Sequence, residues 1–138
     1  MTITSLGHVA LRCRDIEETI AFYETIGVPL GFRMTRPDGT PGEPVFLKVA
    51  PGSFIELFSG GVDEPVRSRT QPGLVHVCLH VDEIHAYYAS LLAKNVATNG
   101  EPKQGRSGNW SFTLPDPNGL SVEIIQLIPG TQMADAAR

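Results

Sequence analysis

A chain of 138 residues is long enough to bury the core of one domain, and a net charge of −4 at pH 7 argues against a nucleic-acid partner. No apolar run reaches membrane-spanning length, and the N-terminus lacks the basic-then-apolar pattern of a signal peptide. We therefore expect a cytoplasmic protein with no membrane partner. Cys13 and Cys78 lie in apolar strand patterns and are predicted to be two buried, reduced thiols.

The first half of the chain predicts a strand, a helix and three further strands. Alternation indicates a strand in which His8, Ala10 and Arg12 share one face. Asp15 suits the N-cap of the helix that follows, and Gly27 suits its C-terminal end. The apolar stripe of this helix comprises Ile16, Ile20, Tyr23 and Ile26. The later strands are expected over residues 29–35, 43–50 and 53–59.

The second half predicts the same order of elements. A strand with His76, Cys78 and His80 on one face leads to a helix with Asp82 as the expected N-cap. The apolar stripe of this helix comprises Ile84, Tyr87, Tyr88, Leu91 and Leu92. Further strands are expected over residues 97–103, 109–114 and 120–127. The unit β-α-β-β-β thus occurs twice, and the face of each sheet that lacks a helix needs a partner.

Each half also carries one histidine and one glutamate at matching places. The corresponding segments are 7–11 and 75–79, and 51–57 and 118–124. His8 and Glu56 are 48 positions apart, and His76 and Glu123 are 47 apart. Imidazole nitrogen and carboxylate oxygen together suit Zn, Ni, Co, Mn or Fe(II). The repeat therefore predicts a divalent metal site made of His8, Glu56, His76 and Glu123.

Taken singly, each of these four residues has an ordinary explanation as a core, rim or surface residue. The repeat favours ligation, and an unpaired carboxylate among the apolar neighbours of Glu56 or Glu123 would be costly to bury. Four ligands of an octahedral ion leave two neighbouring positions, which suit a small-molecule substrate with oxygens on adjacent carbons. The ion would act as a Lewis acid and stabilise a developing enediolate.

Other side chains are weaker candidates for substrate contacts. His80 shares the face of His76 but is equally well explained as a polar rim residue. Trp110 and Phe112 are favoured as core residues over pocket residues, and His85 is expected to face solvent. Scattered basic residues suit an anionic substrate, although surface charge is the commoner explanation; they are Arg12, Arg14, Arg67, Arg69, Lys103 and Arg106.

The pattern resembles the vicinal oxygen chelate superfamily, which contains glyoxalase I, methylmalonyl-CoA epimerase, extradiol dioxygenases, and fosfomycin and bleomycin resistance proteins. The resemblance covers about residues 3–127 and rests on segments 7–11, 14–23, 54–57, 75–77 and 112–124. It implies an α+β fold in which two tandem βαβββ modules form a half-open, eight-stranded, barrel-like sheet, paired in a homodimer. The single domain 1–138 would comprise module one at about 3–59, a linker at 60–73, module two at 74–127 and a mobile tail at 128–138.

The resemblance to glyoxalase I implies a metal-dependent lyase or isomerase that moves a proton on a chelated vicinal-oxygen substrate. Glutathione would then be the co-substrate, bound in a hemithioacetal. Glu123 matches the position of the family's base, and Glu56 is its ligand counterpart. The sites in this family are commonly built between two chains, so His8 and Glu56 would complete their site with the partner's copies of the second pair.

Five alternatives stay open. Methylmalonyl-CoA epimerase performs related chemistry but has Gln at the position of Glu56. An extradiol dioxygenase or a fosfomycin-type thiol transferase would use three ligands, His8, His76 and Glu123. A bleomycin-resistance-like dimer would bind an aromatic ligand without catalysis. An enzyme that acts on a small sugar or keto acid would not need glutathione.

Overall fold

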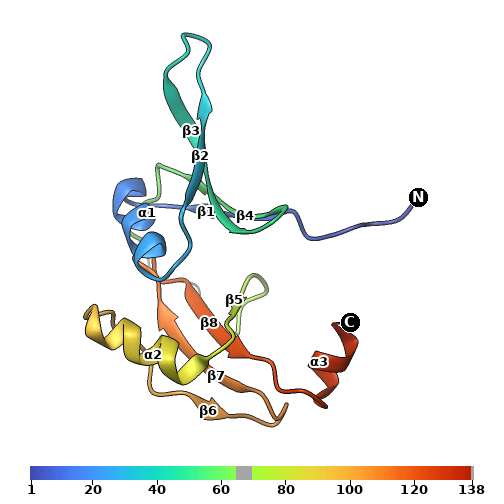
Figure 1. Cartoon of the computed structure of the whole chain (residues 1–138). Coiled ribbons are helices and arrows are strands. Elements are labelled where there is room, and N and C mark those ends of the chain that lie inside the picture. Colours follow the sequence, from blue (N-terminus) through green and yellow to red (C-terminus); the bar gives the residue numbers. More distant parts are fainter. Residues whose placement is uncertain (65–69, 138) are drawn as a thin grey trace. The chain divides into compact units, whose positions relative to one another are not determined.

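The chain divides into two compact units, residues 1–65 and 66–138, and the computed structural model describes residues 1–64 and 70–137 of them. Each unit contains a four-stranded mixed sheet and one long helix in the order β-α-β-β-β (Figure 1). The expectation of an α+β fold made of two tandem βαβββ modules is confirmed. The predicted linker, residues 60–73, includes residues 65–69, which lie outside the described residues.

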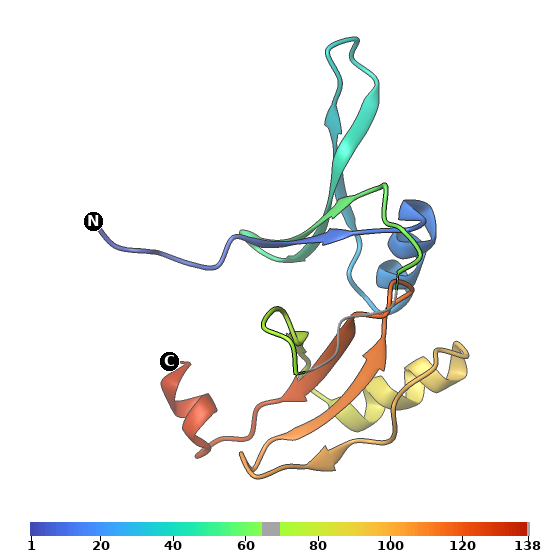
Figure 2. The same cartoon turned by 180° about the vertical axis from the view of Figure 1, so that it is seen from behind.

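The first unit follows the predicted order closely. Its elements are β1 (His8–Arg12), α1 (Ile16–Thr25), β2 (Leu30–Thr35), β3 (Pro41–Ala50) and β4 (Ser53–Phe58). The strand order in the sheet is β1-β4-β3-β2, with β1 parallel to β4 and the other pairs antiparallel. The β2–β3 hairpin extends well beyond α1, and the residues before β1 form an extended segment (Figure 2).

One face of this sheet is buried against α1. Ile20 and Tyr23 point inward from the helix. The strand residues that meet them alternate along β3 and β4, as a period of two requires; they are Val45, Leu47, Ile55 and Leu57. Burial of one such side chain contributes about 1.5–3 kcal/mol. Arg33 on β2 pairs with Glu17 on α1 at 2.8 Å, which ties the helix to this face.

The ends of α1 are those that the sequence predicts. The Asp15 carboxylate accepts hydrogen bonds from the backbone N–H groups of Glu17 and Glu18, at 2.9 and 3.0 Å. These bonds satisfy donors that have no partner inside the helix. Gly27 has a φ of 96°, a left-handed conformation that a residue without Cβ adopts without strain. The helix therefore stops before β2 begins.

The second unit repeats this architecture. Its elements are β5 (His76–His80), α2 (Ile84–Ala93), β6 (Lys103–Gln104), β7 (Trp110–Pro115), β8 (Ser121–Gln126) and a short terminal helix, α3 (Gln132–Ala136). The strand order is β5-β8-β7-β6, with β5 parallel to β8. Phe112 on β7 contacts the rings of Tyr87 and Tyr88 on α2, at 6.4 and 5.2 Å between centroids. The helix thus covers the face that carries Phe112.

Two predictions for α2 are wrong. The N-cap is Glu83 rather than Asp82, and Glu83 makes no side-chain cap hydrogen bond. The first N–H group of the helix, that of Ile84, donates instead to the Gln126 side chain at 2.9 Å, so a neighbouring strand replaces the local cap. Leu92 is 49% exposed, whereas Leu91 is fully buried, because the contact with the sheet is narrower than the apolar stripe.

The strand predicted over residues 97–103 is also wrong, since β6 has only two residues, Lys103 and Gln104. Gly100 has a φ of 121°, and Pro102 has no N–H group to donate to a ladder. The N–H group of Asn99 donates to the Thr113 carbonyl at 2.8 Å, which keeps this segment beside β7. The edge of the second sheet is therefore much shorter than the edge of the first, formed by β2.

The C-terminal segment, expected to be a mobile tail, contains helix α3. The Thr131 hydroxyl accepts from the Ala134 N–H group and caps this helix. Asn109 lies buried beside it, and its Oδ1 accepts from the Ile128 N–H group and the Thr131 hydroxyl, at 2.8 and 3.0 Å. A single buried amide therefore fastens the start of the tail to the loop before β7.

Candidate metal-ligand pairs and their surroundings

The structure brings His8 and Glu56 together on the face of the first sheet that α1 does not cover. In the register between β1 and β4, Ala10 lies opposite Glu56, so His8 and Glu56 are diagonal neighbours on that face. His8 Nε2 lies 3.3 Å from Glu56 Oε2. The imidazole is 50% exposed and the carboxylate side chain only 13%, so the histidine forms the outer member of the pair.

His76 and Glu123 form the same arrangement in the second unit. Cys78 lies opposite Glu123 in the register between β5 and β8, which again makes the histidine the diagonal neighbour. His76 Nε2 lies 3.1 Å from Glu123 Oε2, with the side chains 41% and 23% exposed. The sequence repeat is therefore also a repeat of side-chain geometry.

The donor atoms of each pair have a spacing that suits one metal ion. Ligand atoms at about 2.1 Å from an ion lie about 3.0 Å apart at neighbouring octahedral positions and about 3.4 Å apart in a tetrahedral site. The two observed distances, 3.1 and 3.3 Å, fall in this range. The same distances are also those of an ion pair between a protonated histidine and a carboxylate.

Each unit supplies only half of a four-ligand set. Within either unit, the described residues contain no group of three His, Cys, Asp or Glu side chains that could hold a metal ion. A complete site therefore requires a first pair and a second pair to meet, either in one chain or across two. The assignment of His8, Glu56, His76 and Glu123 as ligands of one ion remains a proposal.

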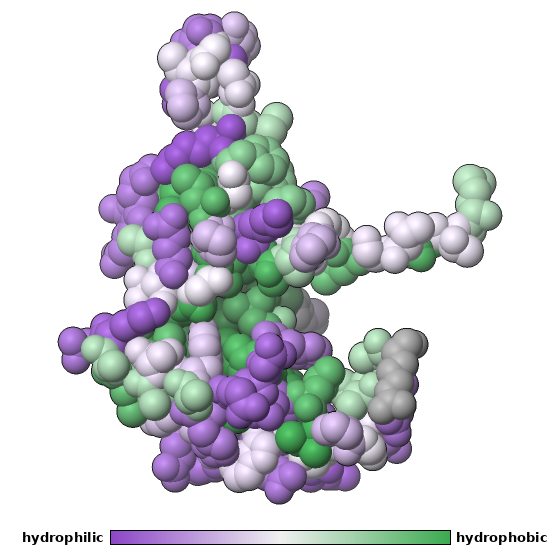
Figure 3. All heavy atoms as spheres, viewed as in Figure 1, coloured by the Kyte–Doolittle hydropathy of each residue, from purple (hydrophilic) through white to green (hydrophobic). Residues whose placement is uncertain are grey.

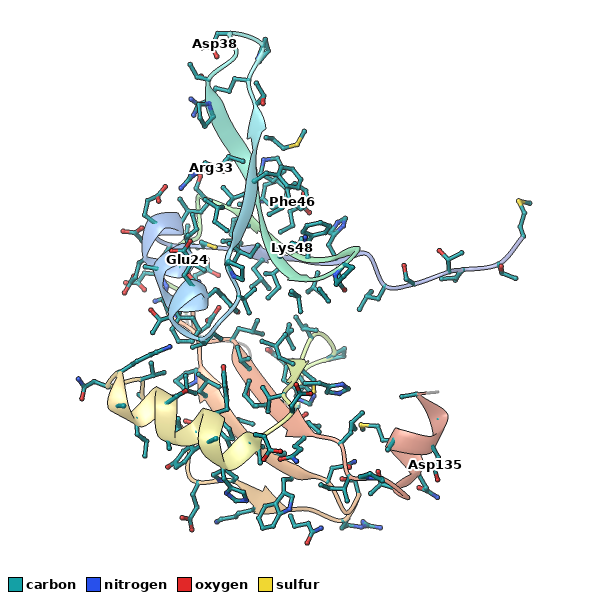
Figure 4. All side chains as sticks on the ribbon, viewed as in Figure 1. Glu24, Arg33, Asp38, Phe46, Lys48 and Asp135 are labelled. Carbon is teal, nitrogen blue, oxygen red and sulfur yellow. The ribbon has the colours of Figure 1, made fainter. Side chains whose placement is uncertain are left out.

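The surroundings of the first pair are aromatic. The rings of Phe46 and His8 meet edge to face at 6.0 Å between centroids. Phe32 stacks on Phe46 at 4.6 Å, and Phe54 meets the edges of both rings at 6.0 Å. Figure 4 shows Phe46 and Lys48 on the side of β3 away from α1, opposite Arg33.

The surroundings of the second pair are small and polar. Glu123 has Thr113 opposite it on β7 and Cys78 opposite it on β5. Ser121 lies opposite His76. The Ser121 hydroxyl is buried and has no hydrogen-bond partner within the described part of the chain. A donor or acceptor left unpaired in this way is costly and is satisfied when a ligand supplies a partner.

Cys78 corrects the prediction of two buried thiols, because only Cys13 is buried and Cys78 is exposed. Atoms of the sheet still surround much of the Cys78 thiol. Desolvation by these atoms, with a smaller contribution from the negative charge of Glu123, raises the pKa of the Cys78 thiol to about 11. The thiol therefore stays protonated at neutral pH and does not act as a free thiolate.

The structure gives most of the weaker candidates a structural partner. Arg14 pairs with Asp63 at 2.8 Å, and Arg12 donates to the Ser59 carbonyl at 2.8 Å while lying over the Phe58 ring. The predicted core role of Phe112 is confirmed, since it is buried under α2, whereas Trp110 lies on the same face and is only half-buried. Arg67 and Arg69 fall outside the described residues. His80, Lys103 and Arg106 are exposed, as is His85, which also contacts Trp110 edge to face at 4.8 Å.

Sequence reasoning missed the aromatic residues beside His8. The signal was present in β3, where Phe46 and Lys48 alternate with the buried Val45 and Leu47 and must therefore face the opposite side. Phe32 was harder to find, because a register shift on each side of the Phe32–Arg33 segment interrupts the pairing of β2 with β3. Its neighbours become clear only from the folded sheet.

Comparison with known proteins gives a consistent result. The model of the Glyoxalase/Bleomycin resistance protein/Dioxygenase superfamily matches residues 5–124. The human mitochondrial methylmalonyl-CoA epimerase is 30% identical over 131 residues, which cover 88% of this chain and 73% of the epimerase. The lactoylglutathione lyase of Schizosaccharomyces pombe is 27% identical over 134 residues, which cover 87% of this chain. The match spans only 44% of that lyase, so less than half of its length is represented here.

A solved structure supports the same fold. The lactoylglutathione lyase of Agrobacterium tumefaciens superposes with a TM-score of 0.66 and 21% identity, covering 91% of this chain and 96% of that one. Within the described residues, no helix has the length and apolar character needed to cross a membrane.

Proposed function

Because this chain belongs to the Glyoxalase/Bleomycin resistance protein/Dioxygenase superfamily, we propose that it is a metal-dependent lyase or isomerase of the glyoxalase I type. The observation that carries the proposal is the repeated pair, His8 with Glu56 at 3.3 Å and His76 with Glu123 at 3.1 Å, at equivalent positions of two modules. Two carboxylates and two imidazoles form a mixed N/O donor set whose two negative charges balance those of a divalent ion.

In this proposal the four residues have different roles in metal binding and proton transfer. A bound Zn, Ni, Co, Mn or Fe(II) ion supplies Lewis acidity for the negative charge that develops on adjacent substrate oxygens. His8, His76, Glu56 and Glu123 would hold the ion, and Glu123 would loosen from it to act as the base. Glu123 takes the proton from the carbon beside the carbonyl and returns it to the neighbouring carbon, as a positioned general base and acid. Its partial exposure, 23%, leaves the carboxylate accessible to a small substrate.

The working assembly is a homodimer in which the first pair of one chain meets the second pair of its partner. This assembly would explain why each unit carries an incomplete donor set. We propose that the protein is cytoplasmic, where the thiols of Cys13 and Cys78 would stay reduced.

The test is metal content followed by activity. Untagged protein is expected to carry about one divalent ion per four-ligand site, measured by inductively coupled plasma mass spectrometry. The apo protein, reloaded with each of the five ions in turn, is then assayed with the hemithioacetal of methylglyoxal and glutathione. Activity with at least one ion supports the proposal. Failure to bind any ion overturns it and favours a bleomycin-resistance-like binding protein.

A second candidate is an epimerase acting on an acyl-CoA thioester. The similarity to the human epimerase, at 30% identity over most of both chains, favours it. The chemistry is again removal and return of a proton beside a carbonyl, so Glu123 would keep its role. A metal-loaded protein that is inactive on the hemithioacetal but exchanges the α-proton of methylmalonyl-CoA would select this candidate.

A further inference from the structure

The helix-free face of the first sheet carries a cluster of phenylalanines whose arrangement suits a flat ligand. Phe32, Phe46 and Phe54 lie on three neighbouring strands and meet at ring distances of 4.6–6.0 Å. Phe32 is 45% exposed, so the outermost ring offers an accessible aromatic surface. Figure 3 shows hydrophobic residues gathered at the base of the β2–β3 hairpin, below its hydrophilic tip.

This aromatic cluster is continuous with the first ligand pair. Phe46 lies opposite Glu56 in the register between β3 and β4, and its ring meets the His8 ring edge to face. A ligand that stacks on Phe46 therefore sits one strand away from Glu56, and a ligand that stacks on Phe32 sits two strands away from it. A strand spacing of about 4.8 Å is close to the width of one aromatic ring.

The Lys48 side chain places a cation on the same face of the sheet, at the far end of a cross-strand row from His8. Lys48 lies opposite Phe54, which in turn lies opposite His8, so one cross-strand row reads Lys48, Phe54, His8. In the part of the chain that the structure describes, the Lys48 side chain makes no ion pair or hydrogen bond. Its ammonium group is therefore available to an anion. Two strand spacings, about 10 Å, separate it from His8.

We propose that this face selects substrates that combine an aromatic ring with an anionic group. In the expected pose, the ring lies on Phe32 and Phe46, the anionic group contacts Lys48, and the reacting carbon lies beside the His8–Glu56 pair. This inference rests on the proposed function, because it assigns the substrate class of the same site. The second sheet, with Cys78, Thr113 and Ser121 on its corresponding face, has no such aromatic surface.

The test is calorimetric titration of the full chain with naphthalene-2-sulfonate and, as an aliphatic match, octane-1-sulfonate. Sulfonates are poor metal ligands, so binding reports on the face rather than on an ion. The aromatic probe is expected to bind several-fold more tightly. Phe32→Ala should weaken it by about two- to tenfold, the range expected for loss of an aromatic contact. Lys48→Gln should weaken both sulfonates by a similar factor.

Leu92→Ala is the matched control, since Leu92 is exposed to a similar extent, 49%, but lies on α2 of the other unit. It should leave both affinities unchanged. Equal affinities for the two sulfonates, or no effect of Phe32→Ala, would overturn the inference. The inference would also be overturned if the wild-type protein bound neither sulfonate and Phe32→Ala converted a dimer to a monomer. In that case a second copy of the chain would cover this face. Metal content and hemithioacetal turnover test the proposed function separately, and their failure would leave these affinities unaffected.

Discussion

The two units share one architecture and one ligand pair but differ in what surrounds that pair. In the first, aromatic rings and Lys48 adjoin His8 and Glu56. In the second, a thiol and two hydroxyls adjoin His76 and Glu123. The repeated features are the order of elements and the histidine–glutamate pair. The divergent features are the side chains beside that pair, so the two sheets present different chemistry on equivalent faces.

The largest expected effect is on kcat, and it differs between the carboxylates of Glu123 and Glu56. Glu123→Gln should lower kcat by about 100- to 10,000-fold, because an amide cannot accept the proton, while most of the metal is retained. Glu56→Gln keeps the base and should cost about tenfold or less. Steady-state kinetics with parallel metal analysis distinguishes the two. Equal losses would show that the units are catalytically interchangeable.

The next prediction concerns the two histidines and the way the halves combine. His8→Ala and His76→Ala should each weaken metal affinity by about 100-fold or more, since loss of an outer-sphere partner alone costs 10- to 100-fold. Refolding an equal mixture of the two variants should restore about a quarter of wild-type activity if sites form across chains, because half of the dimers would carry one intact site of two. Without any restoration, each site is built within one chain.

A core substitution in α2 should have the largest effect on stability. Leu91→Ala should lower the free energy of unfolding by about 2–5 kcal/mol, because Leu91 is fully buried and its removal leaves a cavity. Leu92→Ala, at the exposed neighbouring position, should change it by about 0.5 kcal/mol or less. Urea denaturation followed by circular dichroism measures both. Similar losses would mean that α2 is rotated relative to its sheet.

The tail anchor is a feature of the second unit, where Asn109 holds the chain after β8. Asn109→Ala should cost about 1–3 kcal/mol, because the Ile128 N–H group and the Thr131 hydroxyl lose a buried acceptor. Thr131→Val removes one of these bonds together with the cap of α3 and the bond to the Ile128 carbonyl, so its cost also reports on the start of that helix. Hydrogen exchange of the Ile128 amide should accelerate in the first variant. An unchanged exchange rate would show that the tail is held by other contacts.

The smallest expected difference compares the two helix N-termini. Asp15→Ala should cost about 1 kcal/mol, since its carboxylate caps two N–H groups of α1. Asp82→Ala should cost about 0.5 kcal/mol or less, because Asp82 is not the N-cap of α2. Thermal unfolding of both variants provides the measurement. A larger effect of Asp82→Ala would contradict the assignment of Glu83 as N-cap.

The repeat made much of the fold predictable. Alternation and stop signals located β1, α1, β3 and β4 to within about two residues. The internal repeat, which makes His8 equivalent to His76 and Glu56 equivalent to Glu123, singled out the residues that the structure pairs. The prediction of β6 was wrong because the repeated order of elements was extended over a polar stretch in which Gly100 and Pro102 interrupt a strand. The Asp82 cap was wrong because Gln126, far along the chain, supplies the acceptor.

The sequence by itself determined the two-module order and the four chemically suited side chains, because period-two alternation and internal repetition are local properties that a linear pattern records. Only the tertiary structure decided that Phe32, Phe46 and Phe54 gather beside His8 and that Lys48 ends the same row. Those contacts join strands that are distant in sequence. They depend on register and on the shifts in β2, which no local pattern specifies.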